Sequence, residues 1–285
     1  MQRLGVIVLN DSRAALTALS IAAAGWIVVM ASPAAADPAG DKSWIEVSGY
    51  RPAIDTKINF SRPGAPGAVI DLESTLGLGN RETLPAVYAG THIGRHWVVT
   101  AEYFALSRSG TQNIGRDITF DGVTYPASAS VSGVFDTNVY RATIGYDIVR
   151  NDMVEFGAGI GLHATNFKVG LNGQGRIGNS SLQSENRVET FLAPLPTLGV
   201  YANFAPSPKV SIRGRVDYLS LHVGDYNGSL INTQGEVGYR VVKNFEIGAS
   251  YRYVKYNFGV TKPDYSGNVK YGFNGPALFL RANFQ

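Results

Sequence analysis

The chain of 285 residues contains no cysteine, so it forms neither disulfides nor thiolate metal sites. Charged residues make up only 16% of it, and the 25 basic residues are spread along the chain without forming a block. Nucleic-acid binding depends on a clustered Lys/Arg face, so no nucleic-acid partner is predicted. Helical periodicity is scarce beyond residue 43, and no second long apolar run follows the first 36 residues. Glycine (33) and tyrosine (15) are abundant, and the lack of cysteine fits a fold held by a hydrogen-bonded sheet instead of covalent links.

Residues 1–36 have the pattern of a signal peptide. Arg3 and Arg13 give a positive start, and a charge-free stretch runs from Ala14 to Ala31. Three alanines, at positions 34 to 36, then provide a small-x-small cleavage site. The alternative is an uncleaved anchor, because about 18 apolar residues can just span a bilayer. The alanine site directly after the run favours cleavage, and hence export.

Beyond residue 43, apolar and polar residues alternate with a period of two. From Tyr140 to Ile148 the even positions are apolar or aromatic, and the odd positions are Arg, Thr, Gly and Asp. The ranges Val154 to Ala164 and Phe245 to Tyr253 repeat this arrangement. The glycines between Gly157 and Gly161 fall inside such a strand and open no helix, so they are interpreted as small interior residues and not as a nucleotide loop. Repeated alternating segments of about ten residues are typical of a membrane barrel.

Ten strands are predicted in this way, with short and long connections in turn. The predicted strands begin near Trp44, Leu84, Trp97, Val131, Val154, Phe191, Val210, Leu230, Phe245 and Gly275. The long connections are 61–83, 109–130, 170–188, 224–228 and 261–274, and the short links are 94–96, 150–152, 206–209 and 243–244. Outer-membrane barrels have short periplasmic turns and longer outer loops. The predicted fold is therefore all-β: a transmembrane antiparallel up-and-down β-barrel over residues 44–285, after a short periplasmic segment at 37–43. Eight or twelve strands remain possible, because Pro52 interrupts the first strand.

The end of the chain carries a further signal of export to the outer membrane. Pro276, Leu278, Leu280, Ala282 and Phe284 form one apolar stripe. This stripe resembles the terminal-strand signal of outer-membrane proteins, although Gln285 follows the phenylalanine. The resemblance implies that Phe284 is the residue read by the barrel-assembly machinery.

If the apolar stripes face lipid, the polar stripes line the lumen. Isolated charges there would be costly, so acidic and basic side chains are expected to pair across neighbouring strands. A barrel of about eight strands is filled by side chains, and ten strands lie near that size. We therefore predict a lumen closed by Arg–carboxylate pairs, with a narrow gated conduit as the alternative. The predicted network consists of Glu46, Glu102, Arg141, Asp147, Glu155, Arg213, Arg215, Asp217, Glu236, Arg240, Glu246, Arg252 and Arg281.

Candidate catalytic groups are few, because the chain has only four histidines. His92 and His163 are expected to point inward from different strands, and His96 lies in a predicted periplasmic turn. Ser220 and His222 share one strand face, which weakly resembles lipid A deacylase barrels. The order of the two residues is reversed from that family's pattern. The pair is therefore interpreted as a serine and a histidine that lie at the water-exposed rim of the barrel. The acid pairs and His–Asp pair of the omptin proteases are not found, and no catalytic site is predicted.

Two further groups of residues have simple interpretations. Acidic residues in the outer loops are interpreted as solvated charge, although divalent cations bridging lipopolysaccharide are an alternative. These are Asp71, Glu73, Asp117, Asp121, Asp225 and Asp264. Aromatic residues near strand ends are predicted to form the interfacial girdles. They include Trp97, Tyr103, Tyr140, Tyr201, Phe204, Tyr239, Phe245 and Phe284.

The barrel region resembles small outer-membrane barrels of the OmpA/OmpW-like class. Ile70-Asp71-Leu72-Glu73 followed by Leu76-Gly77-Leu78 also resembles a motif of uncharacterised proteobacterial outer-membrane proteins. Three functions stay open: a structural or surface-binding barrel, a narrow porin-like channel for small solutes, and a lipid A-modifying hydrolase or protease. The first is the leading prediction. No cofactor and no metal is predicted, and the expected partners are outer-membrane lipid, lipopolysaccharide and, during biogenesis, the assembly machinery. The sequence leaves the oligomeric state open.

Overall fold

The computed structural model describes residues 41–284, which form fourteen β-strands and one short helix. The elements are β1 (Ser43–Tyr50), β2 (Ala53–Ser61), β3 (Ile70–Asp71), α2 (Leu72–Leu76), β4 (Leu84–Ile93), β5 (Trp97–Asn113), β6 (Ile118–Phe120), β7 (Val123–Tyr125), β8 (Ser130–Arg150), β9 (Val154–Ile177), β10 (Gln183–Ser207), β11 (Val210–Val223), β12 (Tyr226–Val242), β13 (Phe245–Lys262) and β14 (Tyr265–Phe284). Within these residues, no helix has the length and apolar character needed to cross a membrane. The predicted signal peptide and positions 37–40 lie outside the described residues.

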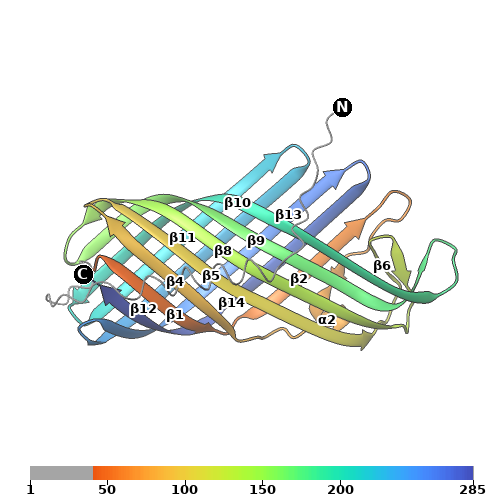
Figure 1. The fold of residues 1–285 in the computed structure, drawn as a ribbon, viewed down its shortest axis with the longest axis horizontal. Coiled ribbons are helices and arrows are strands. Elements are labelled where there is room, and N and C mark those ends of the chain that lie inside the picture. The colour runs from red at the N-terminus through yellow and green to blue at the C-terminus, as the bar shows by residue number, and fades with distance from the viewer. Residues whose placement is uncertain (1–40, 285) are drawn as a thin grey trace.

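Ten of these strands pair in a ring, all antiparallel. The series runs from β4 and β5 through β8 and on to β14 in chain order, and β1 pairs with both β4 and β14. Strands β1 and β2 act as one strand of the wall, because both pair with β14 and only the short break at Arg51-Pro52 separates them. The predicted antiparallel barrel is confirmed, and Figure 1 shows it as a long tilted cylinder.

The short links of the prediction are confirmed as tight turns. Residues 94–96, 151–153, 208–209 and 243–244 separate consecutive strands at one end of the barrel. The end of β14 lies at this end, whereas α2 and β6 lie toward the other (Figure 1). Because short turns mark the periplasmic side, we call these two ends the periplasmic and the outer end.

The prediction of long loops was partly wrong, because the strands continue far into the segments that were assigned to loops. Strand β9 has 24 residues and β10 has 25, with only a five-residue connection at 178–182 between them. A membrane-crossing strand needs only about 9–11 residues. About half of each long strand therefore extends beyond the bilayer on the outer side.

Side-chain orientation along β8 reveals where the barrel leaves the membrane. Near the periplasmic end, Ile144 and Ile148 are exposed on the outer surface, and Arg141 and Asp147 are buried in the lumen. Nearer the outer end the pattern is inverted: Phe135 is buried inside, while outward-facing positions carry polar residues such as Asn138. On strands β9, β13 and β14, too, the inward-facing residues change from polar to apolar toward the outer end. Apolar side chains therefore face lipid in the periplasmic half and fill the interior in the outer half.

The outer half of the wall has one place where no long strand is available. Strand β4 begins only at Leu84, so β2 and β5 have no long strand between them near the outer end. Residues 62–83, which we call the wall segment, lie in this position and include β3 and α2. Strand β3 pairs with β2, and Leu72 and Leu76 of α2 are buried. A backbone segment thus completes the wall where strand pairing stops.

Candidate functional site: the barrel interior

The lumen of the periplasmic half is occupied by paired charges, which we call the lumen charge layer. Glu102 lies between two arginines: Arg141 approaches it at 2.9 Å, and Arg252 donates a second short hydrogen bond to it. Arg141 also lies 3.4 Å from Asp217, which pairs with Arg215 at 2.9 Å. These five side chains come from four different strands, so the pairs cross the lumen as well as the strands.

A second group of pairs lies closer to the periplasmic end. Arg213 contacts both Glu236 and Glu246 at 2.7 Å. Arg281 pairs with Glu46 at 2.8 Å and approaches Glu236 at 3.5 Å. Each arginine thus bridges two carboxylates, a use that suits the planar, multi-donor guanidinium group.

The structure buries or half-buries all thirteen residues of the predicted network. It also adds one that the sequence analysis missed: Asp41, which precedes the first strand and pairs with Arg240 at 2.5 Å. Its position outside any alternating segment left no pattern from which its orientation could be predicted. Two predicted members, Asp147 and Glu155, pair with no arginine among residues 41–284 and instead lie beside His92.

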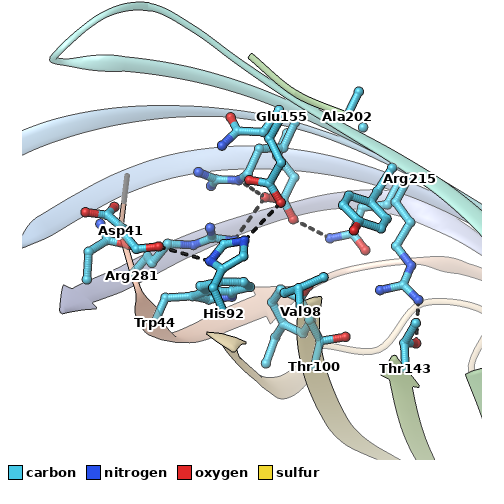
Figure 2. A pocket seen from close by; sticks show the side chains of 18 of the residues that line it. Asp41, Trp44, His92, Val98, Thr100, Thr143, Glu155, Ala202, Arg215 and Arg281 are labelled. Atoms are coloured by element: carbon cyan, nitrogen blue, oxygen red, sulfur yellow. Dashed lines mark hydrogen bonds and ion pairs between the residues drawn. The ribbon is translucent and has the colours of Figure 1, made fainter. Parts of the chain in front are cut away.

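A cavity of about 100 Å³ lies within this layer. Figure 2 shows His92, Glu155, Arg215 and Arg281 among the side chains around it. The volume is enough for a few water molecules, each of which occupies about 30 Å³ in the liquid. It is a local pocket among ion pairs, lined by groups from opposite sides of the barrel.

The lumen of the outer half contains a packed apolar and aromatic interior, the outer core, that the sequence analysis did not predict. Phe167 is fully buried, and its ring lies 5.1 Å from that of Phe191 and 6.1 Å from those of Phe135 and Tyr271, centroid to centroid. The outer core includes Ile58, Phe60, Phe104, Leu106, Phe135, Val139, Phe167, Val169, Leu171, Val254, Tyr256, Tyr271 and Phe273. The signal was available, because Phe135 and Val139 occupy the same strand face as Arg141.

The hairpin of β6 and β7 packs onto the outer end of this core. Its apolar side chains are fully buried, and Phe120 meets Phe60 edge-on at 5.3 Å. Strand β7 pairs with the outer end of β9, and Arg62 pairs with Asp121 at 2.5 Å. The predicted loop at 109–130 is thus partly an ordered cap over the outer core.

The wall segment is held by a buried ion pair. The Arg108 side chain, fully buried, donates to Glu73 at 2.5 Å and to the hydroxyl of Thr56 at 2.7 Å. The same Glu73 accepts a hydrogen bond from the Thr56 backbone N–H at 2.8 Å. For Glu73, the interpretation as solvated loop charge was therefore wrong, because its carboxylate joins β2 to β5 across the break in the wall.

Asp71 has a separate role as the N-cap of α2. Its side chain accepts a hydrogen bond from the Ser74 N–H at 2.9 Å, and Gly77 ends the helix in the left-handed conformation at φ +68°. Burial raises the pKa of the Asp71 carboxyl, but the Ser74 hydrogen bonds and the Lys57 ammonium outweigh burial and lower it overall. The short motif noted in the sequence thus has a structural role in closing the wall.

The candidate catalytic residues do not form a site. Ser220 and His222 are exposed and share the outward face of β11 with Tyr218, so they do not reach the lumen. His163 is buried where the charge layer meets the outer core, and its Nε2 forms a short hydrogen bond with the Tyr256 hydroxyl. The Nδ1 of His96 lies 3.0 Å from the backbone carbonyl of Asp147 in the neighbouring turn.

The predicted aromatic girdle is largely on the outer surface, with one exception. Trp97, Tyr239 and Phe245 are exposed near the periplasmic turns, as expected for anchors at the interface. Tyr201 was assigned to the girdle wrongly, since its hydroxyl donates to the buried carboxylate of Asp147 at 2.6 Å. It fits because Gly157 has no side chain: a Cβ there would lie 2.3 Å from the Tyr201 hydroxyl.

An antiparallel strand ring with an outward apolar band and tight turns at one end defines the class: the chain is an outer-membrane β-barrel protein. Among solved structures, it is similar to the outer membrane protease OmpT from Escherichia coli, with a TM-score of 0.55. The match covers 89% of this chain and 99% of that chain at 11% sequence identity, so it shows the fold alone.

Two other matches have much lower scores. The Pseudomonas putida toluene transporter TodX has a TM-score of 0.36 at 10% identity and covers 88% of this chain and 93% of that chain. The Yersinia pestis attachment invasion locus protein Ail has a TM-score of 0.34 at 15% identity, with 84% and 99% covered. No family model and no curated protein matches the sequence.

Proposed function

We propose that this protein is a non-conducting outer-membrane barrel with a structural or surface-binding role, performed by the half that extends outside the bilayer. The observation that carries the proposal is the double filling of the lumen. Paired charges occupy its periplasmic half, and the outer core occupies the rest. A solute would have to displace both the lumen charge layer, which is held by ion pairs, and the outer core, which is held by apolar packing.

The filled interior also suits a surface-binding role. Packed side chains make the outer half rigid, and a rigid surface loses little conformational entropy when a partner binds. The alternative of a hydrolase or protease has less support, because Ser220 and His222 are exposed outside the barrel and the similarity to OmpT concerns the fold alone.

We propose lipopolysaccharide as the partner of the outer surface next to the membrane. Lys255 follows Tyr253 on the outward face of β13, and Tyr253 is the last aromatic residue of the apolar band on that strand. Lys270 of β14 is also exposed and pairs across the sheet with Asn257, two positions further out on β13. Ammonium groups at this level can neutralise the phosphates of lipid A headgroups.

Single-channel recording tests the closed lumen. Refolded protein in planar bilayers is expected to give no regular conductance steps, because the paired charges and the outer core occupy the lumen. Gel mobility before and after boiling, measured on the same preparation, shows whether the barrel was folded. Regular unitary steps whose ion selectivity reverses in an Arg215→Glu variant would establish a conducting lumen and overturn the proposal.

Binding to lipid A vesicles tests the partner. Replacement of Lys255 and Lys270 together by glutamine is expected to weaken binding by about thirtyfold at low salt, since about 1 kcal/mol is typical for each basic residue near an anionic surface. Lys243→Gln, in a periplasmic turn, is the matched control and should leave binding unchanged. Equal binding by all three proteins would exclude these lysines as lipopolysaccharide contacts.

A further inference from the structure

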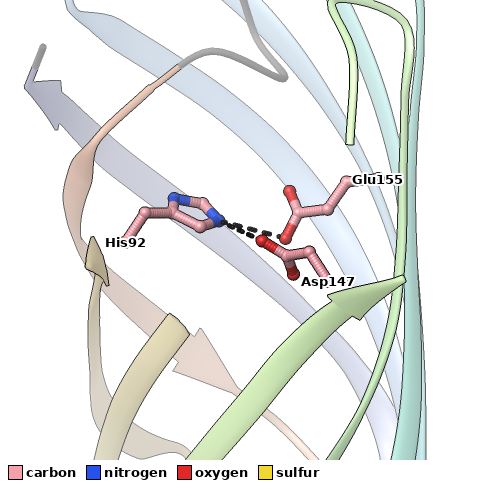
Figure 3. Close-up of side chains that lie close together, drawn as sticks. All are labelled: His92, Asp147 and Glu155. Carbon is pink, nitrogen blue, oxygen red and sulfur yellow. Dashed lines mark hydrogen bonds and ion pairs between the residues drawn. The ribbon is translucent and has the colours of Figure 1, made fainter. Parts of the chain in front are cut away.

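Three side chains from three strands converge near the periplasmic end of the lumen, as Figure 3 shows. His92 lies near the end of β4, Asp147 near the end of β8, and Glu155 at the start of β9. The Nε2 of His92 is 3.2 Å from Glu155 Oε1 and 3.6 Å from Asp147 Oδ2. All three residues are buried.

The hydrogen bond at the far side of the imidazole determines which nitrogen is free. His92 Nδ1 lies 3.1 Å from the backbone carbonyl of Asp41. A carbonyl oxygen can only accept, so Nδ1 carries the proton and donates it there. In the neutral imidazole, Nε2 then presents a lone pair toward two carboxylates. That arrangement is repulsive unless a cation lies between them, either a second proton on Nε2 or a metal ion.

The charge balance of the lumen favours a divalent ion. Apart from Asp147 and Glu155, each acidic residue of the lumen charge layer, with Asp41 included, pairs with at least one arginine. Arg150, the cross-strand neighbour of Glu155, makes no ion pair with either carboxylate in the described chain. The Asp147 side chain has no solvent exposure, and its Oδ2 has no hydrogen-bond partner within residues 41–284. Two negative charges thus remain at this one place.

We propose that His92, Asp147 and Glu155 form a binding site for a divalent first-row transition metal ion such as Zn²⁺. Ligand atoms about 2.1 Å from a tetrahedral ion lie about 3.4 Å from one another, close to both measured separations. One imidazole and two carboxylates are ligands that such ions accept. The ion would neutralise the two unpaired carboxylates and link β4 to β8 and β9.

The surroundings of the cluster are those of a built site. The Asp41 carbonyl orients His92, and the Tyr201 hydroxyl donates to the other oxygen of Asp147 at 2.6 Å. Outer partners of this kind fix the orientation and tautomer of metal ligands. The 100 Å³ cavity borders both His92 and Glu155 (Figure 2). Water or a small anion from this cavity would supply the fourth ligand.

Titration of the folded, metal-free barrel in detergent with Zn²⁺, followed by calorimetry, tests the site. The wild-type protein is expected to bind one equivalent, and His92→Gln and Asp147→Asn are each expected to weaken binding at least tenfold. With Co²⁺ as the probe, the visible absorption spectrum should report a nitrogen–oxygen ligand set that is lost in His92→Gln. Heat modifiability of each variant establishes that the barrel has formed before its affinity is compared.

His222→Gln is the matched control, because His222 is exposed near the outer end and should not affect binding. Failure of the folded wild-type protein to bind Zn²⁺ at millimolar concentration would overturn the proposal, leaving the imidazolium as the cation between the carboxylates. Binding with unchanged affinity in His92→Gln, or loss of binding in His222→Gln, would also overturn it, since the metal would then be bound elsewhere.

Discussion

Replacement of Arg141 by methionine is expected to lower the free energy of unfolding by about 3–5 kcal/mol, the usual cost of breaking a buried ion pair. Arg141 contacts Glu102 and Asp217 at once, and both carboxylates are buried. Methionine keeps much of the side-chain volume but leaves Asp217 with one arginine fewer and Glu102 with only Arg252. Unfolding by urea of protein reconstituted in phospholipid vesicles, followed by tryptophan fluorescence, measures the change.

Lys168→Met provides the comparison for Arg141. Lys168 pairs with Asp136 at 3.5 Å, but its side chain is half exposed above the membrane. Such pairs contribute about 0–1 kcal/mol. In the Arg141→Met background, Glu102→Gln should recover part of the lost stability, because it removes one of the carboxylates left short of a partner. If Arg141→Met costs as little as Lys168→Met, the lumen charge layer is hydrated and does not close the barrel.

Replacement of Phe167 by alanine is expected to cost about 3–5 kcal/mol as well, for a different reason. The Phe167 ring is fully buried among Phe135, Phe191 and Tyr271, and its removal leaves a cavity that the rigid strands cannot collapse to fill. The same urea unfolding experiment measures the loss. Because water surrounds the outer half, burial of this ring is stabilised by the hydrophobic effect in the ordinary way.

Leu278→Ala is the control for Phe167. Leu278 is 72% exposed on the outer surface within the apolar band, where lipid tails surround it. Unfolding in urea moves this position from lipid to water, so truncation loses the transfer free energy of the removed carbons, but lipid leaves no cavity; we expect a cost of about 2 kcal/mol, smaller than that of Phe167→Ala. Equal losses for the two variants would mean that the interior of the outer half is not a packed core.

The positions of the strands could be predicted from the sequence because strand patterns are local. A period of two follows from the pleat itself, so Tyr140 to Ile148 could be assigned as strand without any knowledge of its neighbours. The tight turns were predicted for the same reason, since a few polar residues between two alternating segments allow only a hairpin. The inward orientation of Arg141, Glu155 and Glu246 follows directly from their strand faces.

The limit of that reasoning lies at the membrane boundary. An alternating segment has the same period whether its apolar stripe faces lipid or the barrel interior. The stripe alone therefore does not determine which face of the strand contacts water. The residues after Tyr253 on β13 keep the same orientation, but the polar and apolar faces change places: Lys255 is exposed and Tyr256 is buried. Other outer segments, at 170–177 of β9 and 265–274 of β14, were assigned to loops because they are polar and rich in glycine.

The sequence by itself determined the strand class, the periodicity, the tight turns and the composition of the lumen face, all of which depend on neighbouring residues. Only the tertiary structure decided which charges pair, what fills the outer half, how the wall segment replaces a strand, and that His92 meets Asp147 and Glu155. These features depend on strand register and ring closure, which bring together residues far apart in the chain, such as Ser43 with Phe284 and His92 with Glu155. A local pattern contains no information about such distant partners, because the hydrogen bonds that align the strands are made by backbone groups common to every residue.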